Sequence, residues 1–277
     1  MNTIQKLTNA VVVVALAGAV CTTGCNKEDN NSIIVPTATN NENLRAFASG
    51  SSQGNTADKI AVEAQTLGTV SQRLSGATSS PIVTKDSVNK VIYIDFGSGI
   101  VGEDSVNRAG IIRVQYTDDY FTPGSVLTIT FVNYKTNGSL LEGTRTITNM
   151  GVNGSGNMYW QVEAINMKKT AIDGVTWRKW NSSRTREMVS GFATPGDLSD
   201  DVYHINGTAD GAFSNGSVFT ANIIDLVRES SCLWISSGVI NAVVDNKDNY
   251  SADFGNGDCD NKVVVTYPDG TVEDLFL

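Results

Sequence analysis

The sequence predicts a mainly β protein: an antiparallel β-sandwich or meander with two similar halves, preceded by a disordered tether and one short N-terminal amphipathic helix. Two observations predict this fold. From residue 82 onward, short runs rich in Val, Ile, Thr, Tyr and Phe are separated about every 8 to 12 residues by Gly, Asn or Asp. Similar phrases near the two ends of this region also indicate an internal repeat.

Residues 1–24 have the pattern of a lipoprotein signal peptide. A basic residue precedes an apolar and small-residue stretch at residues 10–21, which is shorter than the roughly 20 apolar residues that span a bilayer. Gly24 then provides the small residue that lipoprotein signal peptidase requires, whereas a larger residue precedes Cys21. Cys25 is therefore the predicted lipidation site, carrying diacylglycerol and palmitate chains. The rival interpretation is a cytoplasmic protein with an accidental cysteine.

Residues 25–55 are predicted to form the lipid anchor and a flexible tether. They are rich in Asn, Ser, Thr and Gly, and such a composition buries too little apolar surface to offset the entropy of ordering. An acylated Cys25 would make the membrane a partner of the protein, because more than one acyl chain gives stable anchoring.

The charge distribution argues against nucleic acid as a partner. The formal net charge is −9, and phosphate binding depends on clustered Lys and Arg. The nearest basic groups are Lys168-Lys169 and the stretch at residues 178–186. We interpret both as solvated strand edges.

A helical segment is predicted at residues 56–76. Ile60, Ala64, Leu67 and Leu74 recur at helical spacing, and Gly76 is the predicted stop. We expect this helix to cover one end of a sheet; docking of a partner is the alternative.

Residues 77–277 are predicted to form the β-rich domain. Turn signals between its strands are Pro123-Gly124, Asn137-Gly138, Asp173-Gly174, Asn215-Gly216 and Asp269-Gly270, which suit residues at positive φ. The clearest predicted strands are 91–94, 110–116, 126–134, 144–149, 159–165, 202–207, 218–224, 239–244 and 262–267.

The internal repeat relates residues of about 79–117 to residues of about 230–268. Asp95-Phe96-Gly97-Ser98-Gly99 in the first copy corresponds to Asp253-Phe254-Gly255-Asn256-Gly257 in the second. Only the second copy carries a cysteine pair, Cys232 and Cys259, which we predict to form a disulfide. Closing a loop of about 26 residues would stabilise the fold by roughly 3 kcal/mol on the chain-entropy model.

No cofactor, metal or catalytic residue is predicted. Zinc needs about four ligands, and the only histidine, His204, lies in a predicted strand with no nucleophile-elbow motif nearby. Asp245–Asn249 and Asp258–Asn261 offer oxygen ligands for calcium, but turn chemistry explains them better. Carboxylate pairs for glycoside hydrolysis could be drawn from Asp118, Asp119, Glu142, Glu163, Asp200 and Asp201.

Three tryptophans are candidate ligand-binding aromatics: Trp177, Trp180 and Trp234. Together with Tyr159 and Trp160, they could form a sugar-stacking platform, although core packing is the favoured interpretation. Because Trp177 and Trp180 are three residues apart, a strand would direct them to opposite faces. Ser87 and Ser105 each lie in an Asp-Ser-Val phrase that is similar to the O-glycan attachment sites of exported Bacteroidetes proteins.

Two sets of residues resemble known sequences. Cys25-Asn26-Lys27-Glu28-Asp29 resembles the C-x-K-[DE]-[DE] signal that sends Bacteroidetes lipoproteins to the outer face of the outer membrane. Residues 94–99, 124–149 and 253–260 resemble a group of secreted Bacteroidetes lipoproteins of unassigned function. The first box of that group usually ends in a cysteine that this chain lacks. The resemblance implies a surface-exposed, lipid-anchored β protein and no particular chemistry.

These patterns lead to three expectations about function. The preferred one is a non-catalytic protein of the cell outer membrane that binds a glycan or a surface protein. The alternatives are a secreted glycoside hydrolase that uses two carboxylates and a structural envelope component.

Overall fold

The computed structural model describes residues 56–70, 80–102, 104–194 and 197–277. These residues belong to one unit, residues 38–277. The predicted signal peptide, the lipidation site Cys25 and the tether lie outside the described residues. Within the described ranges, no helix is long and apolar enough to cross a membrane.

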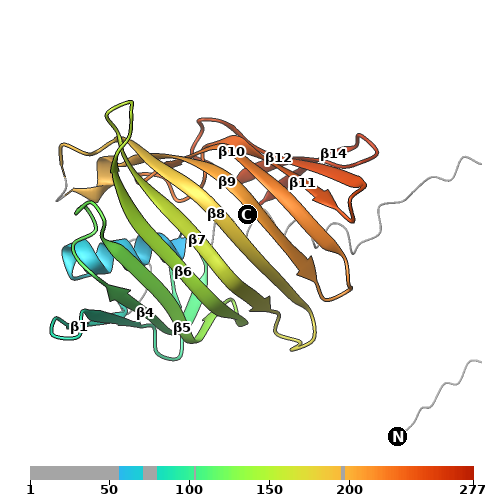
Figure 1. Cartoon of the computed structure of the whole chain (residues 1–277). Coiled ribbons are helices and arrows are strands. Elements are labelled where there is room, and N and C mark those ends of the chain that lie inside the picture. The colour runs from blue at the N-terminus through green and yellow to red at the C-terminus, as the bar shows by residue number, and fades with distance from the viewer. Residues whose placement is uncertain (1–55, 71–79, 103, 195–196) are drawn as a thin grey trace, which may run out of the picture. The chain divides into compact units, whose positions relative to one another are not determined.

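The described strands form a single 14-stranded sheet, in which each pairing is antiparallel (Figure 1). Neighbours along the chain are neighbours in the sheet, except that the short β3 pairs beside β4. This order confirms the predicted mainly β fold and selects a meander over a sandwich. The strands are β1 (Ile82–Asp86), β2 (Val91–Asp95), β3 (Ile100–Val101), β4 (Asn107–Tyr116), β5 (Val126–Thr136), β6 (Ser139–Val152), β7 (Met158–Thr170), β8 (Trp177–Ser190), β9 (Val202–Phe213), β10 (Val218–Glu229), β11 (Ser237–Val244), β12 (Asp248–Asn256), β13 (Lys262–Thr266) and β14 (Val272–Phe276), with a short 3-10 helix η2 (Leu198–Asp200) before β9.

Short turns connect most of these strands because the predicted turn residues supply positive φ angles. Asn137 and Gly138, with φ of 47° and 78°, form the two-residue connection from β5 to β6. The glycines of the other four predicted turn signals also have positive φ. All five predicted turns are therefore confirmed.

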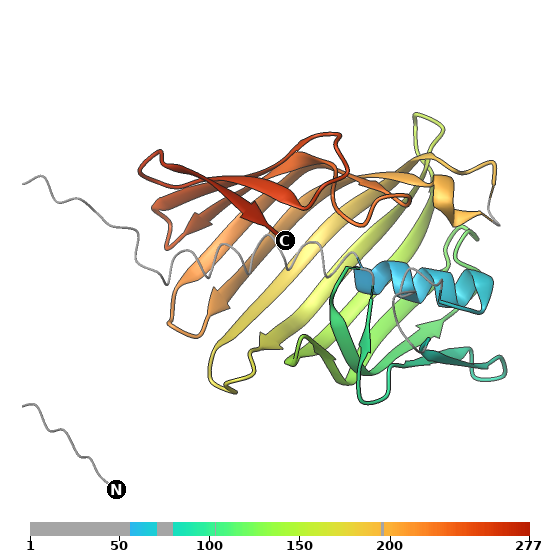
Figure 2. The ribbon, with the colours of Figure 1, turned by 180° about the vertical axis from the view of Figure 1, so that it is seen from behind.

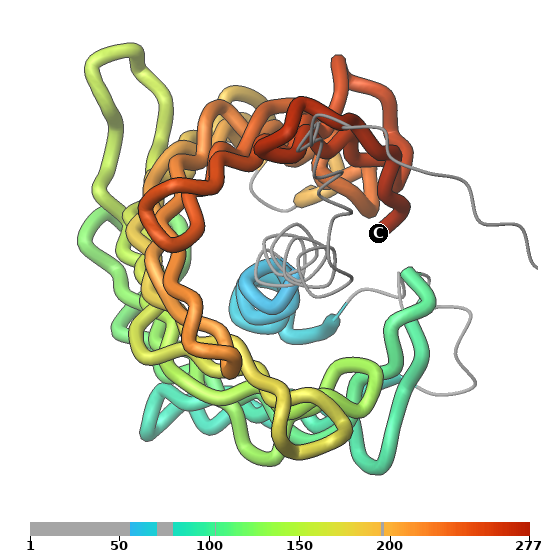
Figure 3. The backbone as a smooth tube through the Cα atoms, turned by 90° about the vertical axis from the view of Figure 1, so that its right-hand side faces the viewer, coloured from blue at the N-terminus to red at the C-terminus, as the bar shows by residue number. Residues whose placement is uncertain are grey.

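The sheet is strongly curved, and the helix at residues 56–67 lies against its concave face (Figures 2 and 3). Bulges at matched positions contribute to the curvature. Gly110 (φ 83°) on β4 faces Asn133 (φ 48°) on β5, and the ladder register shifts beside them. A Cβ on Gly110 would lie 2.3 Å from the carbonyl oxygen of Asn133. Gly143 and Asn166 repeat this arrangement between β6 and β7, and such bulges bend and twist a sheet.

The helix ends earlier and is more deeply buried than the sequence predicts. It ends at residue 67, and Gly68 adopts a left-handed φ of 69°, so the stop is not Gly76. Ala57, Ile60 and Ala61 are buried, as are most residues between 57 and 65. The helix therefore lies within the curve of the sheet instead of covering one end of it.

The core fills the space between the helix and the concave face. Ile60 from the helix belongs to one cluster with Ile112, Ile147 and Trp160 from β4, β6 and β7. Each of these side chains is at most 5% exposed, and burying such a side chain contributes roughly 1.5–3 kcal/mol. Alternate residues of the long strands point to this core, which explains why the predicted strands were rich in apolar residues.

The internal repeat corresponds to similar local structure at the two ends of the strand order. Asp95 and Asp253 each accept a hydrogen bond from the backbone amide two residues later, at 2.7 and 2.9 Å respectively. The intervening Phe96 and Phe254 are both buried. β2 pairs with β4 just as β12 pairs with β13, in antiparallel register.

The predicted disulfide is present. Cys232 in the β10–β11 connection is bonded to Cys259 in the β12–β13 connection, with the Cα atoms 5.7 Å apart. The bond ties two loops at one end of the last strands and closes a sequence separation of 27 residues.

Candidate functional site

The concave face of β8 carries a column of buried polar side chains. Arg178, Ser182, Arg184 and Arg186 alternate with outward-facing residues and are each at most 8% exposed. Residues two apart on a strand share a face, so these side chains all point toward the helix and core. The interpretation of residues 178–186 as a solvated strand edge was therefore wrong, because the cations lie on the inner side of a central strand.

One of the neighbouring arginines fixes the helix to the sheet. Arg145 on β6 makes two hydrogen bonds to the carboxylate of Asp58 on the helix, each 2.7 Å long. Both side chains are about 98% buried or more. This bidentate geometry neutralises one guanidinium and holds the helix in register with the sheet.

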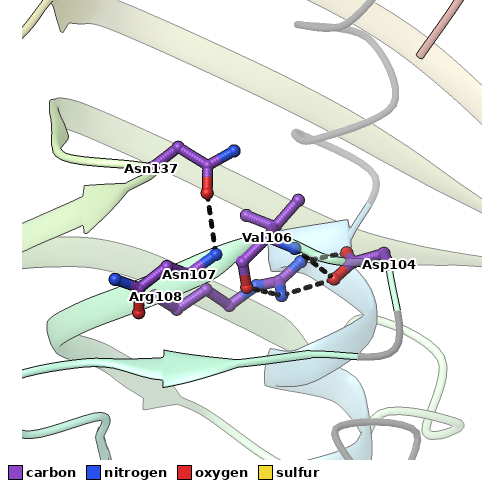
Figure 4. A network of polar contacts seen from close by, with 5 residues as sticks. All are labelled: Asp104, Val106, Asn107, Arg108 and Asn137. Atoms are coloured by element: carbon purple, nitrogen blue, oxygen red, sulfur yellow. Dashed lines mark hydrogen bonds and ion pairs between the residues drawn. The ribbon is translucent and has the colours of Figure 1, made fainter. Parts of the chain in front are cut away.

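A second paired arginine lies near the edge of the sheet (Figure 4). Arg108 on β4 donates to both carboxylate oxygens of Asp104 and to the carbonyl of Val106. The backbone amide of Asn107 donates to the side-chain oxygen of Asn137 in the neighbouring turn, at 2.8 Å. Arg108 thus has its own carboxylate, as Arg145 does.

A pocket opens at one end of the concave face, between the helix and strands β8 to β10. The empty space at this recess is about 480 Å³ when the adjoining open solvent is included. Its lining residues come from the helix, the β4–β5 loop, η2 and strands β8 to β10: Lys59, Val62, Glu63, Tyr120, Arg186, Leu198, Asp201, Tyr203, Ile205, Arg228 and Ser230.

Arg186 is the central cation of this pocket and is surrounded by aromatic rings. Its guanidinium carbon lies 5.8, 5.9 and 5.2 Å from the ring centroids of Tyr120, Trp160 and Tyr203. One terminal nitrogen donates to the hydroxyl of Tyr120 at 2.7 Å, whereas Nε has no hydrogen-bond partner among the described residues. The rings hold the guanidinium in place by cation–π attraction.

Asp201 is the acidic group of the pocket wall. Its Oδ2 accepts a hydrogen bond from the hydroxyl of Tyr203 at 2.7 Å. Burial raises the pKa of Asp201 to about 6, although the Tyr203 hydrogen bond opposes the shift. Burial also raises the pKa of Tyr120 to about 12, so its hydroxyl stays protonated at neutral pH.

The structure brings only one of the sequence-derived carboxylate candidates into the pocket. Asp201 lines the pocket, and the helix adds Glu63, which the sequence did not indicate. The remaining candidates are exposed and lie elsewhere: Asp118, Asp119, Glu142, Glu163 and Asp200. Glu63 could have been found only from the tertiary contact between the helix and β9.

His204 lies on the opposite face of β9 from Tyr203. Its Nδ1 is 2.7 Å from Oδ1 of Asp225, and the side chain is about one third exposed. This geometry agrees with a half-exposed strand histidine. It keeps His204 away from the pocket.

The three tryptophans proposed as ligand-binding aromatics do not gather at one place. Trp177 contacts Lys179 and Trp180 contacts Arg178, so the two rings lie on opposite faces of β8 as their spacing predicted. Trp234 lies half-buried in the β10–β11 connection, where its carbonyl accepts from Arg228. Trp160, a further member of the aromatic set expected from the sequence, contacts the pocket cation: it packs on Arg186 and stacks on Tyr120 with centroids 4.7 Å apart.

The oxygen ligands considered for calcium have hydrogen-bond partners within the protein. Asp245 accepts hydrogen bonds from the backbone amide of Val218 and the hydroxyl of Ser217, and Asp260 accepts from the amide two residues later. Among the described residues, no three His, Cys, Asp or Glu side chains are grouped as metal ligands. Ser87 and Ser105 are both exposed.

The fold and the pocket define a single-sheet, mainly β protein with buried arginines on its concave face. No protein-family model matches the chain, and neither a curated protein nor a solved structure matches it significantly.

Proposed function

We propose that this chain is a non-catalytic lipoprotein of the outer membrane, exposed at the cell surface, that binds a ligand in the concave-face pocket. The observation that carries the binding role is the pocket itself: a recess that presents cationic, carboxylate and phenol groups beside apolar side chains. Pockets with a few convergent polar groups on an apolar wall are the usual form of small-ligand sites. The lipid anchor rests on Cys25 and the residues around it.

A glycan is the preferred ligand. Sugar hydroxyls need both donors and acceptors, and the pocket offers Lys59 and Arg186 as donors with Glu63 and Asp201 as acceptors. Tyr120 and Tyr203 add apolar ring surface next to polar tips. A surface protein is the other ligand class, and it would need contacts beyond a recess of this size.

The test is a binding array of polysaccharides and cell-wall or host glycans with the purified protein. Retention of a glycan that is lost on replacing Tyr203 by Ala, but kept when His204 on the other face is replaced, supports the proposal. Silence across a broad glycan array, together with capture of a stoichiometric membrane partner in pull-downs, contradicts it and favours the structural envelope role.

A second function is favoured by one specific observation. Glu63 and Asp201 line the same pocket, and the raised pKa of Asp201, about 6, suits a general acid. A glycoside hydrolase would therefore use these two carboxylates. Screening of glycoside substrates decides between the roles, because hydrolysis must be abolished by Asp201→Asn and by Glu63→Gln, whereas a binding protein releases no product.

A further inference from the structure

Four of the buried arginines of the concave face form two contrasting pairs. Arg108 and Arg145 each contact a carboxylate, from Asp104 and Asp58 respectively. Arg184 and Arg186 are 5% and 8% exposed, and among the described residues neither forms an ion pair with an acidic side chain. A buried cation that lacks a counter-ion is costly, so an anion that reaches it is bound strongly.

Arg186 differs from Arg184 in its access to the pocket. Arg186 is a lining residue, whereas Arg184, two residues earlier on β8, is not. The Nε of Arg186 is more than nine-tenths buried with its side chain and has no hydrogen-bond partner in the described part of the chain. Tyr120, Trp160 and Tyr203 fix the guanidinium plane, which pre-organises its remaining donors for an oxyanion.

The charge of the pocket also favours an anionic ligand. Its lining contains three cationic side chains, Lys59, Arg186 and Arg228, against two carboxylates, Glu63 and Asp201, a formal excess of one positive charge. The whole chain has a formal net charge of −9. The pocket is thus a local region of opposite sign, which selects ligands by electrostatic complementarity.

We propose that the pocket binds an acidic sugar and that Arg186 pairs with its oxyanion, a carboxylate or a sulfate. This inference rests on the proposed glycan-binding function and adds the charge of the ligand. Arg186 supplies the charge-assisted hydrogen bonds, while the carboxylates of Glu63 and Asp201 accept from the sugar hydroxyls. Val62, Leu198 and Ile205 provide the apolar wall against which the ring packs.

The first experiment uses the unchanged full-length chain in detergent and isothermal titration calorimetry. The probes are D-glucuronate, its neutral methyl ester, D-glucose 6-sulfate, D-glucose and inorganic sulfate. We expect D-glucuronate or D-glucose 6-sulfate to bind at least roughly tenfold more tightly than the ester and D-glucose, as a charge-assisted hydrogen bond implies. The tighter of the two identifies carboxylate or sulfate as the oxyanion.

The second experiment assigns this preference to one residue. Arg186→Gln should abolish the preference for the charged sugar, whereas the matched variant Arg184→Gln, on the same strand but outside the pocket, should keep it. The comparison of acid and ester needs no variant and therefore tests the inference even where Arg186→Gln fails to fold.

Three results would overturn the inference. Equal affinity for charged and neutral sugars would show that the pocket does not recognise an oxyanion, although glycan binding itself would remain supported. Inorganic sulfate bound as tightly as the sugar sulfate shows that the ion alone is recognised. If no charged probe binds, the ligand is not an acidic sugar. The proposed function would still be supported if other glycans in the array bind, and contradicted if none does.

Discussion

Replacing Asp58 by Asn should destabilise the protein more than almost any other polar substitution. Asp58 and Arg145 are 1% and 2% exposed, and two hydrogen bonds of 2.7 Å join the helix to β6 across 87 residues of sequence. Asn keeps the size of the side chain but removes its charge. Arg145 would then remain buried without a carboxylate, beside Arg184, whose pKa burial already lowers to about 10.

Breaking a buried ion pair by removing one partner costs about 3–5 kcal/mol, and we expect Asp58→Asn to fall in this range. For a protein of this size, each kcal/mol lowers the melting temperature by about 2–4 °C, so the expected shift is roughly 6–20 °C. Urea unfolding followed by tryptophan fluorescence, to which the buried Trp160 contributes, gives the free energy of unfolding.

Two further variants make the measurement specific. Asp104→Asn breaks a pair whose carboxylate is 16% exposed, so a smaller loss is expected. Adding Arg145→Gln to Asp58→Asn should recover part of the stability, because the uncompensated charge is then removed. An Asp58→Asn variant within about 1 kcal/mol of the parent would refute the assignment of this pair as the link between helix and sheet.

The remaining predictions concern the disulfide, the pocket carboxyl and the anchor. Cys232→Ala should lower the free energy of unfolding by about 3–4 kcal/mol on the chain-entropy model, and reductant should produce a similar loss in the parent but none in the variant, as thermal melts will show. Because Asp201 binds its proton more tightly in the folded state, with a pKa of about 6 against 3.8, the stability that it contributes is complete below about pH 4 and is lost as the pH rises to about 6. Melting temperatures measured across this window should fall in the parent and stay flatter in Asp201→Asn; equal slopes would contradict the raised pKa. Cys25→Ala should move the protein from the membrane to the soluble fraction on cell fractionation without changing its melting temperature, and unchanged membrane recovery would exclude lipid anchoring at this residue.

Local patterns predicted much of the architecture because they depend on neighbouring residues alone. The turn at Asn137-Gly138 needs only two residues that tolerate positive φ, and the structure has both in that conformation. The cysteine pair was predictable from number and spacing, and the bond between Cys232 and Cys259 is present. Alternating apolar residues likewise identified most central strands.

β8 was not among the clearest predicted strands, because four of its inward-facing residues are polar: Arg178, Ser182, Arg184 and Arg186. One sequence pattern could have shown that these arginines lie together: Arg184 and Arg186 are two residues apart, which places both on one face of any strand. Which face that is could not be known, because burial of Arg186 depends on contacts such as its hydrogen bond to Tyr120, 66 residues away in the chain.

The sequence by itself determined the β class, the turns and the disulfide, since each follows from backbone preference or residue count over a short range. Only the tertiary structure decided that the meander curves around the helix, that Glu63 and Asp201 line one pocket, and that Arg186 is held among three aromatic rings. The physical reason is that curvature, burial and electrostatic pairing are set by contacts between distant segments. Their strength depends on a local dielectric environment that exists only once the sheet has closed over the helix.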